Sequence, residues 1–356
     1  MRELLGPVLD LLGEQPVALA RIVDRTDAGP RETGAAMAVT GDGRVLGSLS
    51  SGCVEAAVVH TAEQVLREGN ACTERFAAAD EFTAGLPCGG EIEVFVERLD
   101  HTALPLLREL HDALTAHHPV ALATTLESTP DRRLLRPDRH EPWRGLDQDA
   151  AALLAAGHHG LIGARDCADT AARPRAFVQV FHTPARMILA GADDYTRALA
   201  TAAAQLGYHV TVVDARETFT TPARFPGAHE VVVDWPHRYL AAEHRAGRLD
   251  HRTVVCVLTH DPKFDVPLLA AALPLPLAFL GALGSRRAHA DRTARLRESG
   301  CAPADIARVH SPLGLDLAAH TPEETAISIL AEILATRTHA SARPLTDLDG
   351  PIHPPR

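Results

Sequence analysis

Two cysteines stand in settings that favour a reactive thiolate. Cys53 ends the run GSLSSGC just before an expected helix, where exposed backbone amides and the helix dipole lower the pKa of a thiol. Cys88 lies in the turn GLPCGG, whose glycines let a ligand or another backbone come close. Two accessible thiolates can ligate a soft metal or carry a sulfur atom. At each position, the competing interpretation is a buried, inert cysteine.

A polar segment, THDPKFD at residues 259–265, follows an expected strand in the second half of the chain. Its His260 and Lys263 are candidate proton donors or anion contacts, and weak candidates for catalysis. Lys263 is the only lysine among the 35 basic residues, and a compact, mobile ammonium group is a property that arginine cannot supply. The plain alternative is a solvated loop at a strand end.

The run GALGSRR, residues 281–287, forms a second candidate anion site. Arg286 and Arg287 stand in the first turn of an expected helix that runs to Arg297, where cations oppose the helix dipole. That placement is explained if the backbone amides at Gly284 and Ser285 and both guanidinium groups hold an anion such as phosphate. An exposed helix with a mildly unfavourable charge placement is the alternative.

A strand ending at Gly191, a helix, and a second strand ending at Asp214 are typical of a dinucleotide-binding unit, with Asp214 as the candidate ribose ligand. The glycine pattern is incomplete, since Asp and Thr occupy positions 193 and 196. Asp193 and Asp194 would repel a pyrophosphate at the helix N-terminus. A helix-capping role fits them well, so NAD(P) binding is disfavoured.

The composition excludes several classes of protein. The 356 residues carry 35 basic and 46 acidic side chains, a net charge of −11 that disfavours binding to nucleic acid. No apolar run approaches the roughly 18 residues of a membrane span, and acidic residues within the first 20 positions argue against a signal peptide, so we expect a cytoplasmic protein. Six cysteines without a CxxC pair favour free thiols over a disulfide framework.

The elements that must position these residues fall into two groups. Residues 1–184 predict an α+β domain with helices at 2–13, 54–69 and 104–117 and strands at 16–26, 35–40, 44–50, 72–77, 91–97, 120–127 and 177–181. The turn Gly41-Asp42-Gly43 predicts a hairpin between two of these strands. The Pro-, Arg- and Asp-rich stretch 128–149 is expected to be a solvated excursion.

Residues 185–338 alternate between strands and helices, which predicts a Rossmann-like, doubly wound parallel sheet with its ligand crevice at the carboxyl ends of the strands. The predicted strands are 187–191, 209–214, 230–234, 253–259 and 275–280, with a helix at 195–206. Thr321-Pro322-Glu323-Glu324 predicts a capped final helix. Residues 339–356 are expected to form a flexible tail.

Long segments of the chain resemble the XdhC/CoxI family, the xanthine dehydrogenase accessory proteins. They are GSLSSGCVEAAV, GLPCGGEIEVFVE, VTVVDAR, VVVDWPHRYL, THDPKFDVPLL, GALGSRR and GLDLAAHTPEETAISILAEI. The resemblance spans about residues 16–337. It implies a cytoplasmic homodimer that binds the molybdenum cofactor, protects it during installation of its terminal sulfido ligand, and delivers it to the apoenzyme of a molybdenum hydroxylase of the xanthine dehydrogenase or CO dehydrogenase type. A cysteine desulfurase is a further expected partner.

The family's two cysteine motifs map onto Cys53 and Cys88, which the resemblance makes contacts of molybdenum or its sulfur. The phosphate of molybdopterin is expected at Lys263, Arg286 and Arg287. This chain has lost one glycine from the family's GSVSGGC, and its paired aspartates replace a glycine-rich loop. Two alternatives stay open: an NAD(P)-dependent oxidoreductase that uses Asp214 or Arg216 for the ribose and His260 or Lys263 as acid, and a non-catalytic binding protein whose thiols sense oxidation.

Overall fold

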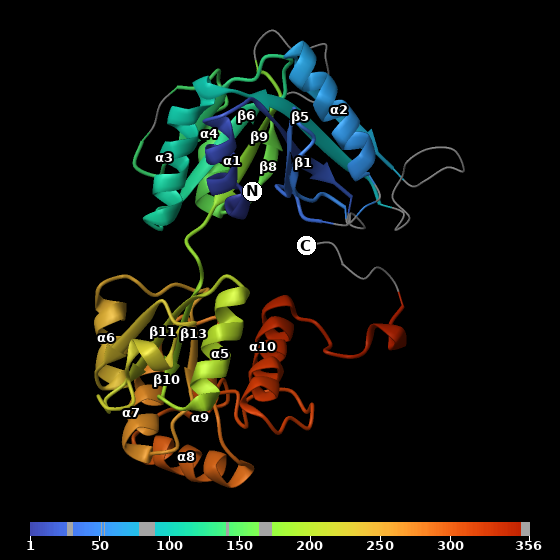
Figure 1. The fold of residues 1–356 in the computed structure, drawn as a ribbon. Helices are drawn as coiled ribbons and strands as arrows, with labels where there is room; N and C mark the ends of the chain where they lie inside the picture. The colour runs from blue at the N-terminus through green and yellow to red at the C-terminus, as the bar shows by residue number, and fades with distance from the viewer. Residues whose placement is uncertain are drawn as a thin grey trace. The chain divides into compact units, whose positions relative to one another are not determined.

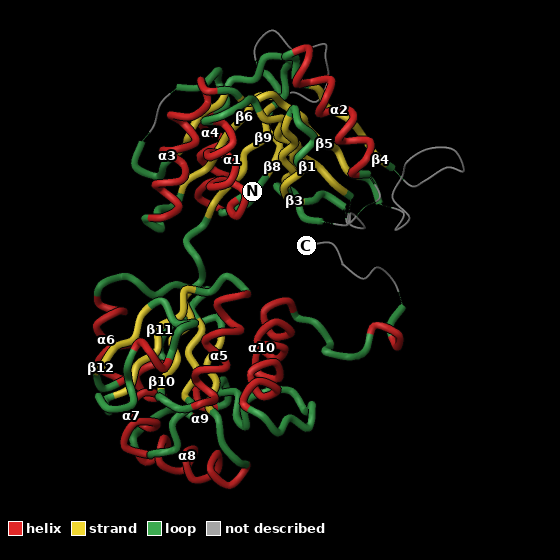
Figure 2. Tube along the Cα trace, viewed as in Figure 1, coloured by secondary structure: helices red, strands yellow, loops and turns green. Residues whose placement is uncertain are grey.

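The computed structural model describes residues 1–26, 31–50, 52, 54–77, 90–139, 142–163 and 173–349. The chain forms two compact units, built on Met1–Thr183 and on Pro184–Leu348 (Figures 1 and 2). The predicted fold class is confirmed, because the first unit mixes helices with antiparallel sheets and the second is a Rossmann-like parallel sheet covered by helices on both faces.

The first unit contains two antiparallel sheets. One has the strand order β3-β2-β1-β5-β4, with β1 (Val17–Arg25), β2 (Ala36–Thr40), β3 (Val45–Gly47), β4 (Cys72–Phe76) and β5 (Ile92–Leu99). The other has the order β7-β6-β9-β8, with β6 (Val120–Thr125), β7 (Arg132–Leu135), β8 (Gly160–Ile162) and β9 (Ala176–Phe181). The helices are α1 (Leu5–Leu12), α2 (Glu55–Glu68), α3 (Leu104–Thr115) and α4 (Asp147–Ala156).

Strand β1 is buried on both faces, and the two faces differ in chemistry. Ala20 and Ile22 pack with the apolar stripe of α2, while the alternate side chain, Arg21, points to the second sheet, because successive strand residues face opposite ways. Arg21 is fully buried, and its guanidinium donates to Glu97 of β5 at 2.6 Å and to Thr124 of β6 at 2.9 Å. A buried hydrogen bond from Arg21 to β6 therefore joins the two sheets, while the ion pair of Arg21 with Glu97 lies within the first sheet.

The stretch 128–149 is not the solvated excursion that its composition predicts. Arg132–Leu135 forms β7 and pairs antiparallel with β6. Trp143 is only 1% exposed, because its indole nitrogen donates to Asp131 at 2.7 Å and its ring packs with α4 and β6. Trp143 and Leu146 of this stretch therefore belong to the hydrophobic core of the first unit.

The second unit has a parallel sheet of order β12-β11-β10-β13-β14. Its strands are β10 (Arg186–Ala190), β11 (His209–Asp214), β12 (Glu230–Val233), β13 (Val254–Val257) and β14 (Phe279–Ala282). Its helices are α5 (Asp194–Gln205), α6 (Pro236–Arg245), α7 (Pro262–Ala272), α8 (Arg286–Glu298), α9 (Pro303–Ile306) and α10 (Pro322–Thr338). The strand predicted at 275–280 begins later, at Phe279, because Leu273 and Leu275 pack as the apolar end of the α7 layer.

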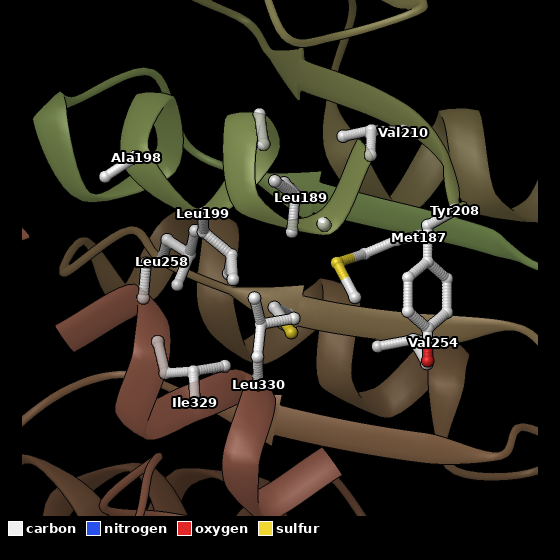
Figure 3. Close-up of a cluster of buried hydrophobic side chains, with 14 of the residues drawn as sticks. Met187, Leu189, Ala198, Leu199, Tyr208, Val210, Val254, Leu258, Ile329 and Leu330 are labelled. Carbon is white, nitrogen blue, oxygen red and sulfur yellow. The ribbon is translucent and has the colours of Figure 1, made fainter. Parts of the chain in front are cut away.

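Helices cover both faces of this sheet, which explains its nearly continuous apolar strands. Met187 and Leu189 of β10 pack with Leu199 of α5 and with Ile329 and Leu330 of α10 (Figure 3). The alternate residues of β10 face α6 and α7. Burial of each such side chain contributes about 1.5–3 kcal/mol. In the described residues, no helix is long and apolar enough to cross a membrane.

The predicted start of α10 is confirmed. Thr321 caps the helix, Pro322 is its first residue, and Glu324 completes a capping box by accepting from the Thr321 backbone at 3.0 Å. These local hydrogen bonds satisfy amides that a helix N-terminus would otherwise leave unpaired.

Candidate functional site

A cleft of about 680 Å³ opens at the carboxyl ends of β10, β11 and β13 in the second unit. The chain winds outward from β10 to β12 on one side and from β13 to β14 on the other, so the cleft lies where the strand order reverses, the usual ligand crevice of such sheets. Its polar and aromatic lining residues are Asp193, Asp194, Arg216, Phe219, Arg224, Thr259, His260, Asp261, Lys263 and Phe264.

Gly191 lets the ends of β10 and β13 meet closely at the floor of this cleft. Its φ of +129° is a conformation that side chains disfavour. A Cβ at this position would lie only 3.1 Å from the backbone nitrogen of Thr259 and 3.2 Å from the carbonyl carbon of Leu258. The role of Gly191 in the structure is therefore close packing of two strand ends.

The capping interpretation of Asp193 is confirmed. Its carboxylate oxygen Oδ1 accepts from the Thr196 backbone at 2.8 Å and from the Thr196 hydroxyl at 3.0 Å, as the N-cap of α5. Asp194 stands beside it in the first turn, 3.6 Å from Arg197. A negative side chain thus occupies the helix N-terminus where a dinucleotide would place its pyrophosphate, so the cleft is poorly suited to NAD(P).

Asp214, the candidate ribose ligand, is 1% exposed. Both of its carboxylate oxygens accept from Arg216, at 2.9 Å from Nε and 2.6 Å from Nη2. This hydrogen bonding raises the pKa of the Arg216 guanidinium, so Arg216 stays charged. Arg216, and not Asp214, lines the cleft.

The segment 259–265 is helical from Pro262 onward, and not the loop that its polarity suggests. Asp261 caps α7 by accepting from the Lys263 backbone at 3.1 Å, and it pairs with the Lys263 ammonium at 3.0 Å. The Lys263 hydrogen bond is the main cause that holds the pKa of Asp261 below its ordinary value. Lys263 is 59% exposed and, like His260, lines the cleft.

The run 281–287 forms the end of β14 and the start of α8. Gly284 has a φ of +141°, and Ser285 caps α8 by accepting from the Ala288 backbone at 3.2 Å. Arg286 and Arg287 are exposed in the first turn of the helix. The structure brings His260 and Lys263 to the cleft with the residues after Gly191, but the described residues that line the cleft do not include positions 284–287.

A buried ion pair that sequence reasoning missed connects these two segments. Asp265 of α7 and Arg292 of α8 are 3% and 5% exposed, with 2.8 Å between their charged atoms. Asp265 also accepts from Thr259 at the cleft, and Arg292 donates to the carbonyl of Leu283 at 3.0 Å. The sequence shows an acidic and a basic residue on two consecutive helices, but no local spacing indicates that Asp265 and Arg292 pair with each other.

Cys53 and Cys88 lie outside the described residues. Beside the first of them, Glu55 accepts from the backbone amides of Ser50 and Gly52, both at 2.8 Å, and from Leu49 at 3.2 Å. Although burial opposes the shift, hydrogen bonds from Ser50 lower the pKa of Glu55 to about 2. Glu55 is a second residue that sequence reasoning missed, and it holds the backbone just before position 53. Within the described ranges, no three His, Cys, Asp or Glu side chains gather as a metal site.

Two family models match the chain. The XdhC Rossmann domain matches residues 187–333, and the XdhC and CoxI family matches residues 11–77. The chain is 28% identical to a probable xanthine dehydrogenase subunit of Bacillus subtilis, over 93% of this chain and 96% of that protein. It is 27% identical to the molybdenum cofactor insertion chaperone PaoD of Escherichia coli, over 92% of this chain and 86% of that protein.

A solved structure supports the same assignment. The crystal structure of a xanthine dehydrogenase from Bacillus halodurans superposes with a TM-score of 0.70 at 26% identity, over 95% of this chain and 97% of that one. Matches in both units and along nearly the whole chain agree with the motifs around positions 53, 260 and 285. The chain belongs to the XdhC/CoxI family.

Proposed function

We propose that this protein binds the molybdenum cofactor and delivers it to the apoenzyme of a molybdenum hydroxylase of the xanthine dehydrogenase or CO dehydrogenase type. The observation that carries the proposal is membership of the XdhC/CoxI family, together with similarity to an insertion chaperone over 92% of the chain. The cleft supports it, since the carboxylate at the start of α5 disfavours the dinucleotide that such a sheet ordinarily binds.

The cofactor carries a phosphate, and three cations line the cleft: Arg216, Arg224 and Lys263. Lys263, which is 59% exposed, is the cation proposed to contact the phosphate, with His260 as a further donor. Arg286 and Arg287, with the backbone at Gly284 and Ser285, offer a second anion contact at the neighbouring strand end. In this proposal, Gly191 and Asp214 shape the cleft without touching the cofactor.

The proposal also includes help with sulfuration of the cofactor. Cys53 and Cys88 are the residues assigned to contact molybdenum or its sulfido ligand, because thiolates are suitable ligands for a soft metal centre. A cysteine desulfurase would then supply the sulfur. A homodimer in the cytoplasm is part of the same proposal.

Equilibrium binding tests the main claim. Purified protein is titrated anaerobically with isolated molybdenum cofactor, and with NAD and NADP in parallel, by calorimetry. Stoichiometric binding of the cofactor without binding of either dinucleotide is the expected result. Binding of NAD or NADP alone would overturn the proposal and favour an oxidoreductase.

Retention of the sulfurated cofactor tests the thiol assignment separately. Cys53→Ala is expected to lose the cofactor faster on gel filtration than Cys72→Ala, a matched control at an exposed cysteine of the same unit. Cys256→Ala is a second control, because burial raises the pKa of that thiol to about 12 and keeps it protonated. Equal retention by all three variants would reject Cys53 as a contact.

A further inference from the structure

An exposed aromatic ring stands in the cleft among charged neighbours. Phe219 is 45% exposed, although most phenylalanines of such a domain are buried. The guanidinium carbons of Arg216 and Arg224 lie 5.3 Å and 5.5 Å from the centre of its ring. Both guanidinium groups lie over the ring, so Phe219 presents an aromatic surface with positive charge against it.

Backbone hydrogen bonds fix the position of Phe219 in the cleft. The Phe219 backbone amide donates to the carbonyl of Arg216 at 3.0 Å, which closes a turn directly after β11. The Phe219 carbonyl accepts from Arg224 at 3.0 Å. Next to it, the hydroxyl of Thr220, which is 4% exposed, donates to the carbonyl of Arg216 at 2.9 Å. Phe219 is therefore anchored at its backbone, and 45% of its surface stays exposed although two guanidinium groups lie over the ring. That exposed aromatic surface is suited to stacking.

Hydrogen-bond acceptors line the same cleft. Both bonds that the Asp193 side chain accepts from Thr196 go to Oδ1, so Oδ2 remains as an acceptor for a ligand. Asp261 differs from Asp193, because Lys263 engages both of its carboxylate oxygens, Oδ1 through the backbone amide and Oδ2 through the ammonium group. Such a cleft disfavours polyanions near α5 and favours a flat ring with N–H groups at its edge, because ionised carboxylates accept strong hydrogen bonds from N–H donors.

We propose that Phe219 is the platform on which the flat heterocycle of this protein's ligand stacks, with the N–H groups of the ring directed to Asp193. The inference rests on the proposed function for the identity of that ring, which is then the pterin of the molybdenum cofactor. The phosphate end of the cofactor lies away from α5, toward Lys263. The cleft would select its ligand by stacking on the ring and by accepting hydrogen bonds from N–H groups, whereas an ordinary Rossmann unit selects its ligand by binding pyrophosphate.

The probe for this test is free 6-hydroxymethylpterin, whose own fluorescence reports binding through its anisotropy. Phe219→Ala is expected to weaken pterin binding by about tenfold or more, the size of a lost aromatic stack. Phe219→Trp is expected to retain binding. Leu206→Ala is the matched control, since Leu206 is 50% exposed in the same unit but does not line the cleft. Both positions are exposed, so the variants are expected to fold.

Equal binding of the pterin by wild type and Phe219→Ala would overturn the inference. So would binding of NAD or AMP, but not pterin, that depends on Phe219, because the ring would then be adenine. Binding of the intact cofactor by the wild type separates the two proposals. If Phe219→Ala binds intact cofactor as wild type does, the proposed function stands and the stacking inference fails. If wild type binds pterin through Phe219 but not the cofactor, the stacking inference stands and the proposed function fails.

Discussion

The two units of this protein place their charged side chains in opposite ways. In the first unit, charges lie between the sheets, where Arg21 contacts Glu97 and Arg175 donates to Glu93 at 2.6 Å. In the second unit, the strands have apolar residues on both faces, a buried ion pair joins Asp265 and Arg292 of two helices, and further charged groups gather where the strands end. The difference predicts that charge between the sheets holds the first fold together, whereas the charged groups at the strand ends of the second unit are available for a ligand.

The largest expected effect comes from breaking the buried charges of the first unit. Glu97→Leu leaves the fully buried Arg21 without its carboxylate and is expected to destabilise this unit by about 3–5 kcal/mol. Urea denaturation measures the loss. Trp143, 1% exposed in the first unit, reports the transition once Trp235→Phe has removed the other tryptophan.

A double variant and a surface control complete that test. Arg21→Leu combined with Glu97→Leu is expected to recover most of the stability, since no charge is then buried alone and Arg132, 19% exposed, can turn to water. Glu127→Leu breaks the exposed pair with Arg144 and is expected to change little. If Glu127→Leu lowers the free energy of unfolding as much as Glu97→Leu does, burial does not determine how much each charge contributes to stability.

A smaller effect is expected at Glu55, which holds a loop and not a whole unit. Its pKa is about 2 in the folded chain against an ordinary 4.5, so its stabilisation is complete above pH 4.5 and is lost as the pH falls toward 2. Glu55→Gln is expected to cost roughly 1–2 kcal/mol locally, a figure already reduced for solvent screening. Hydrogen exchange at the amides of Leu49, Ser50 and Gly52, which donate to Glu55, measures it.

The pH dependence of this hydrogen exchange distinguishes the effect of the Glu55 charge from the effect of its side-chain shape. Wild type is expected to lose protection of these amides below pH 4.5, whereas Glu55→Gln is expected to show weak protection with no such dependence. Glu63→Gln, at an exposed position of the same helix, is the matched control. Protection in the Gln variant that still falls with acid would mean that another group titrates in this loop.

Local patterns were enough to predict the features that local interactions determine. The start of α10 followed from four residues, TPEE, because a capping box is formed within one turn. The parallel strands followed from their apolar runs. The position of the cleft followed from the alternation of strands and helices, because a doubly wound sheet has one reversal of strand order.

Features made by distant contacts could not be predicted. Arg21 sits in VALARIVDR, where alternation favours an exposed side chain, and only the second sheet buries it. Trp143 lies in a polar stretch, and its burial depends on the pairing of β7 with β6. At the candidate site, the strand–helix–strand pattern pointed to Asp214 as a ligand, but Arg216, two residues later, occupies both of its oxygens.

The smallest expected change in stability belongs to the cleft, at Asp193. Asp193→Gly restores one glycine of the dinucleotide pattern and removes the negative charge at α5, at a cost of only a few tenths of a kcal/mol because glycine also caps helices. Its affinity for NAD, measured by calorimetry, is expected to rise about fivefold, because the positive end of the helix dipole is no longer neutralised by a carboxylate. Asp193→Asn keeps the cap without the charge, so a similar gain there would assign the effect to electrostatics and a gain in the glycine variant alone would assign it to backbone access. If neither variant binds NAD more tightly while both keep their stability, the carboxylate at α5 is not the group that disfavours dinucleotides in this cleft. The assignment of the strand-end charges of the second unit to ligand binding would then have to rest on Lys263 and Phe219 instead.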